Sequence, residues 1–553
     1  MSTTAAGLVQ TAVLVVALAA THRPFGTYLA RVYSAERHWL VERLVYRLVR
    51  VDPSSEQRWS AYAAGVLGFS LASVLLLYGM QRVQAWLPWS FGRGAVPPGV
   101  AFNTAVSFVT NTNWQSYTPE QVMGHSVQMA GLTVQNFASA AVGMAVAIAL
   151  VRGFARAESD RLGNVWVDVT RGVVRVLLPL SFVAAIGLVA FGAVMSLEPG
   201  FAVTGLDGQA HTIATAPVAS QEAIKELGTN GGGVLNANAA HPFSNPNGWS
   251  NLLEIFLLLV IPVSMTRTFG ILVGDRRQGR AILAVMGLLW AGMLTVAWWA
   301  ETHPNGPATL AAGAAVEGTE SRFGIPSSVL WAVSTTGTST GAVNSMHDSY
   351  TGLGGGALLM NMLFGEVAPG GVGAGLYGML VLAVIAVFLA GLMVGRTPEF
   401  LGKKLGRREV TAAAVAVLAV PTLVLVGAGA AIAVPATRAA MTNSGAHGLS
   451  EVLYAYASAG NNNGSAFAGL TVTSDFFEST LGAVMLLGRF VPIVAVLALA
   501  GSLAAQRRVA ASAGTLPTNG PLFVGLLTAT VLLVAALTFV PALALGPIAE
   551  ALA

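Results

Sequence analysis

Ten long runs of apolar residues divide the chain, and each is about long enough to cross the hydrocarbon core of a membrane. A spanning helix needs about 20 consecutive, mostly apolar residues. The runs cover residues 4–21, 60–80, 126–151, 172–195, 249–273, 281–300, 372–395, 411–434, 478–503 and 521–546. Their number and length predict an all-α membrane protein with ten transmembrane helices.

Basic residues alternate with these runs. Segments rich in Lys and Arg follow every odd-numbered run, for example the arginines between residues 23 and 50, whereas longer segments poor in them follow the even-numbered runs. The positive-inside rule then places the basic segments in the cytoplasm and both termini outside. The first Lys or Arg, Arg23, follows the first run, opposite to the polarity of a cleaved signal peptide. We therefore expect that run to remain as a helix.

The composition is that of a protein surrounded by lipid, and it excludes several classes of function. Only 10% of the residues are charged and 54% are hydrophobic, whereas a soluble chain carries about a quarter charged residues. There is no cysteine, which excludes disulfides and thiolate chemistry. The net charge of +4 resides in short loops and forms no stripe suited to nucleic acid, so we expect no nucleic-acid partner.

Four of the segments predicted to lie outside share one pattern, a short amphipathic stretch followed by a turn of Thr, Ser, Asn and Gly. The stretches are Ala101–Val109, Val218–Leu227, Pro326–Ser334 and Leu449–Ser458. The turns begin at residues 110, 229, 338 and 461. One such turn is more often an ordinary loop, but four at a regular spacing, each between two spanning runs, indicate an internal repeat. The pattern predicts four helix–pore-loop–helix units around a pseudo-fourfold axis.

The repeat gives the expected domain organisation, in which the first and last spans lie outside the four units. The expected parts are residues 1–57 (first span and basic loop), 58–152, 153–274, 275–396 and 397–505 (pore units 1 to 4) and 506–553 (last span).

The composition of the four turns is typical of a filter for a monovalent cation. A dehydrated cation needs rings of oxygen atoms, which channels supply from backbone carbonyls. Gly and Asn tolerate the positive φ that such turns require, and the turns contain no Asp or Glu, which favours K+ or Na+ over divalent ions. The candidate filter residues are Asn111, Thr112, Asn113, Thr229, Asn230, Gly231, Gly232, Ser339, Thr340, Gly341, Asn462, Asn463 and Gly464.

Longer motifs around these turns resemble one known family. They are Asn111 to Tyr117, Gly228 to Gly233 with Asn236 to Asn238, Gly341 to Val343 before Met346 to Ser349, Asn461 to Ala466, and Gly488 to Phe490. Together they resemble the KdpA family, the potassium-binding subunits of the Kdp potassium-transporting ATPase, over essentially the whole chain. No turn has the TVGYG sequence of common K+ channels, so we expect an asymmetric filter.

The resemblance implies a K+-selecting subunit that does not hydrolyse ATP. The chain has no Gly-Lys-Ser or Gly-Lys-Thr phosphate loop and no Asp-Lys-Thr-Gly motif. The family implies a separate KdpB-like P-type ATPase subunit, with ATP and Mg2+ bound there, and two small single-span subunits, KdpC-like and KdpF-like. It also implies a bacterial inner membrane. The chain itself is expected to bind no cofactor, and K+ is the only metal ion predicted.

Three further residues are candidates for roles near the filter. Gln115 follows the first turn and is expected to support it. Arg489 lies in the middle of the ninth run, where an intramembrane charge is a functional candidate by default. It is either a positive barrier below the filter or a packing residue. Glu366 is expected to open the seventh span, either on an ion exit path or as a plain loop carboxylate. His347 and Asp348 offer too few ligands for a metal, so hydrogen-bonded support of the filter is favoured.

The sequence leaves two other function classes open. One is a passive K+ or Na+ channel or a secondary transporter of the same four-pore-loop superfamily, which would conduct ions without an ATPase partner. The other is a structural membrane subunit without an ion site.

Overall fold

The computed structural model describes residues 3–303, 315–510 and 515–552. In these residues ten helical segments are long and apolar enough to cross a membrane, as predicted. They are α1 (Thr3–Ser34), α3 (Trp59–Arg82), α6 (Val134–Ala155, preceded by a π-helical turn, Val127–Thr133), α7 and α8 (Val165–Arg171 and Leu178–Phe191, joined by a π-helical turn), α10 (Gly248–Leu272), α11 (Arg276–Thr302), α15 (Ala374–Met393), α16 (Arg407–Ala433), α19 (Asp475–Ala505) and α20 (Pro521–Leu545). The chain is therefore a multi-pass membrane protein.

Four shorter helices correspond to the predicted amphipathic stretches. They are α4 (Pro98–Val109), α9 (Val218–Leu227), α13 (Gly324–Thr336) and α18 (Gly445–Asn461). The predicted bounds are correct to within a few residues, and each helix ends at one of the four turns. We call α4, α9, α13 and α18 the pore helices.

The remaining elements are short. They are α2 (Leu40–Leu48), α5 (Pro119–Val122), α14 (Gly352–Leu363), α17 (Pro435–Arg438), α21 (Pro547–Leu552), the antiparallel pairs β1 (Gly200–Thr204) with β2 (Ala210–Ala214) and β3 (Glu399–Phe400) with β4 (Lys403–Lys404), and three 3₁₀ turns at Gln84–Trp86, Asn238–Ala240 and His347–Ser349.

Two predicted helix ends differ most from the structure. Helix α1 continues to Ser34, so that Arg23 lies on a helix and not in a loop. The fourth span begins at Val165, so that Arg171 lies inside it, where the hydropathy pattern predicted a loop. Single arginines are tolerated near helix ends because the head group reaches polar partners. Here the Arg171 guanidinium donates to the Ala35 carbonyl.

The third unit differs from the others because its second helix is broken. After the third turn, α14 runs to Leu363, and a loop of residues 364–373 separates it from α15. Glu366 lies in this loop and does not open the seventh span, so that prediction was wrong. The hydrophobic run that defines the span begins only after the glycine-rich stretch Gly370–Gly373.

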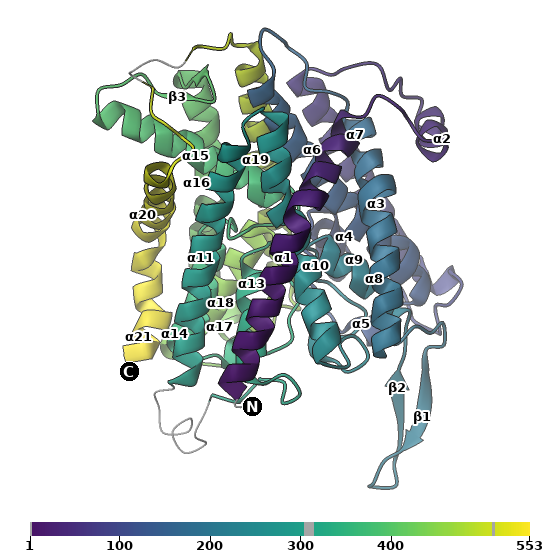
Figure 1. The fold of residues 1–553 in the computed structure, drawn as a ribbon. Coiled ribbons are helices and arrows are strands. Elements are labelled where there is room, and N and C mark those ends of the chain that lie inside the picture. The colour runs from purple at the N-terminus through teal and green to yellow at the C-terminus, as the bar shows by residue number, and fades with distance from the viewer. Residues whose placement is uncertain (1–2, 304–314, 511–514, 553) are drawn as a thin grey trace.

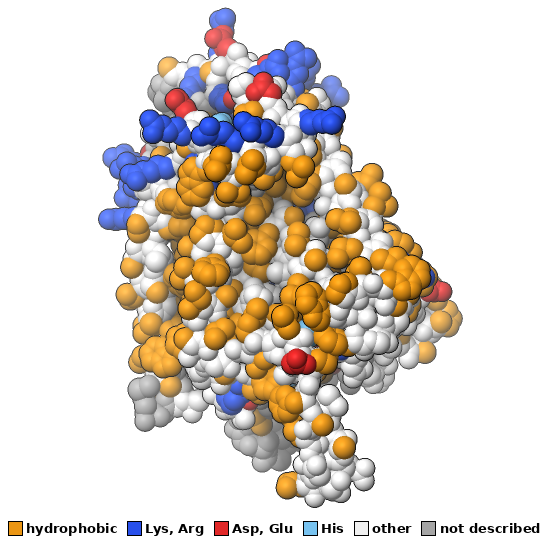
Figure 2. Space-filling view, turned by 90° about the vertical axis from the view of Figure 1, so that its right-hand side faces the viewer, with side chains coloured by type: hydrophobic (Ala, Val, Ile, Leu, Met, Phe, Trp, Pro, Cys, Tyr) orange, Lys and Arg blue, Asp and Glu red, His pale blue; other side chains and the backbone are white. Residues whose placement is uncertain are grey.

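The two ends of the molecule differ in charge. Both termini lie at the lower end in Figure 1, and β3 lies at the opposite end. In Figure 2 a band of Lys and Arg side chains borders the upper edge of a wide hydrophobic belt. This is the arrangement that the alternation of basic loops predicted, with an even number of spans returning the chain to its starting side.

Small residues allow close packing of the helices around the centre. A Cβ built at Gly153 would lie 2.7 Å from the Ala500 backbone, and one built at Gly488 would overlap the Gly460 carbonyl. Both sites bring α19 against a neighbouring element. Close approach through small residues is a common mode of helix association in membranes, and here it brings α6 and the pore helix α18 against α19.

Candidate functional site

The four turns share one backbone feature, a positive φ shortly after the pore helix. One to three residues after each pore-helix end, one residue has a positive φ: Asn111 (68°), Thr229 (48°), Ser339 (51°) and Asn462 (60°). Two positions further on, Asn113 (57°), Gly231 (108°) and Gly464 (102°) are positive again, whereas Gly341 is not. Residues other than glycine rarely adopt a positive φ. Its recurrence in four segments therefore indicates one shared structural role.

The first three turns contact one another in sequence. The Asn111 side-chain amide donates to the Thr229 carbonyl over 2.8 Å, which joins the first turn to the second. The Gly341 N–H donates to the Asn230 carbonyl over 3.1 Å, which joins the second turn to the third.

The fourth turn closes the ring. A Cβ built at Gly341 would lie 2.8 Å from the Gly464 carbonyl carbon, and the Asn463 amide donates to the Thr335 carbonyl over 3.2 Å. The Asn462 amide donates to Thr112 Oγ1 over 3.0 Å. The four turns therefore form a closed ring, and it contains every candidate filter residue that the sequence predicted. All of these residues are buried except Gly464, which is half-buried.

Three of the four candidate filter glycines, Gly231, Gly341 and Gly464, are required for two different reasons. Gly231 and Gly464 have positive φ and no room for a side chain. The expectation of positive φ was wrong for Gly341, which needs to be glycine only because of its close approach to Gly464.

The ring presents neutral oxygen atoms from the ends of four helices. Each pore helix ends directly at its turn, so its last carbonyls and the negative end of its dipole face the ring. Threonine hydroxyls add to this supply and bond to each other in the first and third turns, Thr110 to Thr112 at 2.7 Å and Thr338 to Thr340 at 2.9 Å. Such a ring can replace the hydration shell of a monovalent cation.

Gln115 connects the first turn to the second. Its Oε1 accepts from the Gly233 N–H, and its Nε2 donates to the Gly233 carbonyl, both over 3.0 Å. The same Nε2 donates to Tyr117 Oη over 3.0 Å. This pair of bonds to one residue fixes the second turn against the first.

Aromatic and histidine side chains support the other two turns from behind. Trp331 Nε1 donates to the Ala342 carbonyl over 2.8 Å after the third turn. His347 Nδ1 lies 2.8 Å from Tyr454 Oη, which lies 2.8 Å from Ser465 Oγ, and Ser465 Oγ donates to Asn463 Oδ1 over 2.5 Å. His347 therefore reaches the fourth turn through hydrogen bonds, as the sequence favoured.

Arg489 and Glu366 lie beside the ring. Both are buried. The Glu366 carboxylate faces Ser339 and Asn463 of the ring, and the Arg489 charge acts on it. A Cβ built at Gly143 would lie 3.2 Å from Arg489 Nη2, so the guanidinium extends across to α6.

A cavity of about 120 Å³ begins at this point. Ser339, Asn462 and Arg489 line its polar end. Apolar residues of α15, α16, α19 and α20 line the rest, among them Val381, Val417, Pro492, Val531 and Phe539. The cavity therefore extends from the ring sideways between these helices.

Sequence reasoning missed a buried ionic cluster behind the second turn. Lys225 Nζ lies 2.6 Å from Glu222 Oε1 and 3.4 Å from Glu226 Oε1, and all three side chains are buried. Lys225 Nζ also donates to Asn238 Oδ1 over 2.8 Å, and Asn238 Nδ2 donates to the Gly231 carbonyl over 2.7 Å. The cluster thus reaches the ring through one amide. Three charges on a ten-residue helix between membrane spans were the signal that could have revealed it.

Among the described residues, two groups of acidic or histidine side chains lie close enough together to share a metal ion. Glu222, Glu226 and Glu254 surround Lys225, whose ammonium already supplies a counter-charge. Asp348, His447 and Glu451 form the other group, outside the spanning helices. There, hydrogen bonds to Asp348 and Glu550 raise the pKa of His447 to about 10. His447 is therefore protonated and binds α18 to α21 at neutral pH.

Ten spans, four pore helices and a closed ring of turns define the class of membrane proteins with a pseudo-fourfold pore-loop fold. A solved structure described as "Crystal Structure of the Potassium Transporter TrkH from Vibrio parahaemolyticus" is similar in fold, with a TM-score of 0.53 at 14% identity over 86% of this chain and 97% of that one. The family model described as "KdpA: Potassium-transporting ATPase A subunit" matches residues 12–552. The chain belongs to this family.

Curated relatives extend over the full chain. The chain is 64% identical to a protein of Rhodococcus erythropolis over 99% of both chains and 60% identical to one of Streptomyces coelicolor over 100% of both. It is 61% identical to one of Mycobacteroides abscessus over 100% of this chain and 99% of that one. All three are named "Potassium-transporting ATPase potassium-binding subunit". The predicted family, the fold class and the assignment as one subunit of a transporting ATPase are confirmed.

Proposed function

We propose that this chain selects K+ in the ring of four turns and passes it to a separate ATPase subunit. The observation that carries the proposal is the closed ring, whose four turns each have a positive-φ residue shortly after the pore helix and meet through contacts between segments up to 350 residues apart. Neutral carbonyl, amide and hydroxyl oxygens suit a weakly hydrated monovalent ion better than a divalent one. The family and the names of the relatives supply the identity of the ion.

The filter residues are those predicted from the turns, with Gln115 as their support. A K+ ion leaving the ring meets the Arg489 guanidinium, which stays charged at any relevant pH and repels it from the central axis. The cavity between α15, α16, α19 and α20 offers a sideways route. Glu366, whose neighbours Gly365 and Val367 line this cavity, provides a carboxylate that attracts the cation. Such a design prevents backflow of accumulated K+ through the ring.

The working complex contains a KdpB-like catalytic subunit, where ATP and Mg2+ bind, and two small single-span subunits that are KdpC-like and KdpF-like. It lies in the bacterial inner membrane with both termini of this chain on the periplasmic side. The band of Lys and Arg side chains in Figure 2 supports this orientation because cytoplasmic loops carry the excess of Lys and Arg.

The test compares the purified complex with the chain alone, each in liposomes. We expect the complex to show ATPase activity that depends on K+ and the chain alone to show no K+ flux. Steady K+ conduction by the chain alone would favour the alternative of a passive channel. Absence of any K+-dependent activity or stabilisation in either preparation would overturn the proposal and favour a structural subunit.

A further inference from the structure

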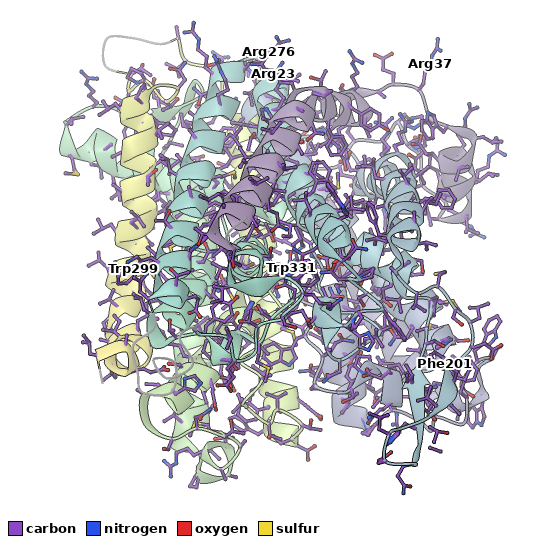
Figure 3. The ribbon with its side chains drawn as sticks, turned by 60° about the horizontal axis from the view of Figure 1, so that its bottom comes forward. Arg23, Arg37, Phe201, Arg276, Trp299 and Trp331 are labelled. Carbon is purple, nitrogen blue, oxygen red and sulfur yellow. The ribbon has the colours of Figure 1, made fainter. Side chains whose placement is uncertain are left out.

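A group of cationic side chains converges at the basic end of α1, α10 and α11. His22 and Arg23 of α1, Arg267 of α10, and Arg276 and Arg280 of α11 line one pocket of about 450 Å³. Figure 3 shows Arg23 and Arg276 close together at this end of the molecule. We call this group the basic pocket.

The basic pocket contains no counter-charge from the described part of the chain. Several other arginines at this end pair with carboxylates, such as Arg152 with Asp168 at 2.5 Å and Arg156 with Glu56 at 2.6 Å. By contrast, none of the four arginines of the pocket has a carboxylate partner among the described residues.

Arg267 shows the deficit most clearly. The charges that act on it come from Arg276, Arg23 and Arg280, all cations. Its Nε is buried and has no hydrogen-bond partner among the described residues. The nearest acid along the chain, Asp275, accepts instead from the Arg277 N–H and from the Asn519 amide. Like charges held together near a membrane repel one another, so the pocket requires an anion from outside the chain.

An apolar groove of about 650 Å³ leads away from the basic pocket. The basic pocket and the groove share His22, Arg23 and Leu283. Apart from these shared residues, the groove is lined almost wholly by apolar side chains, Val15, Leu18, Ala19, Leu259, Val263, Met286, Trp290, Ala291 and Pro369. It runs along spanning helices and therefore lies at the depth of the acyl chains.

We propose that the basic pocket and the groove together bind an anionic phospholipid. The phosphate accepts hydrogen bonds from the guanidinium groups, which match phosphate geometry, and an acyl chain fills the groove. A free phosphate would leave the groove unfilled, and a zwitterionic lipid would leave the cations without net compensation. This inference does not depend on how the ring selects ions.

The test measures lipid retention by the purified full chain. The probes are dioleoylphosphatidylglycerol and dioleoylphosphatidylcholine, titrated into delipidated protein and counted by native mass spectrometry. The variant is Arg23→Gln with Arg276→Gln. The matched control is Arg37→Gln with Arg47→Gln, which removes the same charge from exposed positions on the same end of the protein.

We expect wild type and control to bind the anionic lipid more tightly than the zwitterionic one. Each cation near a lipid surface contributes about 1 kcal/mol, so the double variant should lose about thirtyfold in affinity for the anionic lipid. Arg23→Lys with Arg276→Lys should retain most of it. Equal affinity of wild type for the two lipids, or an equal loss in the control, would overturn the proposal.

A second measurement separates a lipid from a protein occupant. A photo-crosslinking side chain at Leu283, in the part shared by pocket and groove, should yield a lipid-sized adduct in the intact complex in mixed vesicles. A protein-sized adduct at this position would show that a partner helix fills the groove, and the proposal would be wrong.

Discussion

Gly231→Ala tests whether the ring depends on a conformation that only glycine adopts easily. Gly231 has φ +108°, and an added Cβ would lie well inside 3.0 Å of the Gly341 backbone. A side chain in a sparsely populated backbone region costs roughly 1–3 kcal/mol, and the third turn would also have to move. If this cost falls on the K+-bound state, the apparent affinity should fall roughly five- to 150-fold.

The same turn offers the control. Gly233 has no positive φ, and a Cβ there would meet its nearest neighbour, Lys225 Nζ, only at 3.6 Å. Its backbone bonds to Gln115 remain possible in Gly233→Ala. The assay is K+ activation of ATP hydrolysis by the purified complex, with Rb+ as competitor.

We expect Gly231→Ala to lower the apparent K+ affinity and to alter discrimination against Rb+. We expect Gly233→Ala to change neither property. If Gly231→Ala retains both properties, or if the two variants are equally impaired, the ring is not the selective element.

Three further predictions concern residues around the ring. Gln115→Arg removes the Gly233 bonds and places a charge roughly 7 Å from the ion, which at an effective dielectric of about 20 costs about 2 kcal/mol or about thirtyfold in apparent K+ affinity; wild-type affinity would contradict this placement. Arg489→Met should increase passive K+ flux through liposomes containing the complex, and Arg489→Lys should increase it less. Normal pumping by Arg489→Met without additional K+ leak would show that Arg489 is a packing residue. For His447, a folded pKa of about 10 against about 6.5 unfolded means that its stabilisation is complete below pH 6.5 and is lost as the pH rises through 10. The difference in melting temperature between wild type and His447→Gln should therefore shrink over this range, and a constant difference would refute it.

The repeat could be predicted because it depends on local composition. Pore helices and turns have short, distinct patterns, and four copies at a regular spacing identify one another even where each copy alone is ambiguous. The predicted pore-helix bounds, such as Val218–Leu227 for α9, are accurate because the turn residues end the helix where the apolar pattern ends.

Features that depend on contacts between distant segments could not be predicted. The Lys225 cluster looked like the polar face of an amphipathic helix, and only the fold shows that it is buried and bonded to Asn238. Helix α14 was not predicted because its 12 residues are too few to cross a membrane, so the search for long apolar runs passed over it. The length of α1 was misjudged because hydropathy registers Arg23 as the end of a span, although the helix continues past it.

The closed ring has a consequence for how this protein is made. Its last junction joins Asn462 to Thr112, 350 residues earlier in the chain, so a growing polypeptide holds three turns in the membrane long before the fourth is synthesised. Until then the first three turns cannot form a closed ring, and an ion cannot be surrounded by carbonyls from all four turns. The proposed ion site can therefore be complete only after the fourth turn has been synthesised. A chain truncated before that point carries most of the mass of the protein but cannot close the ring.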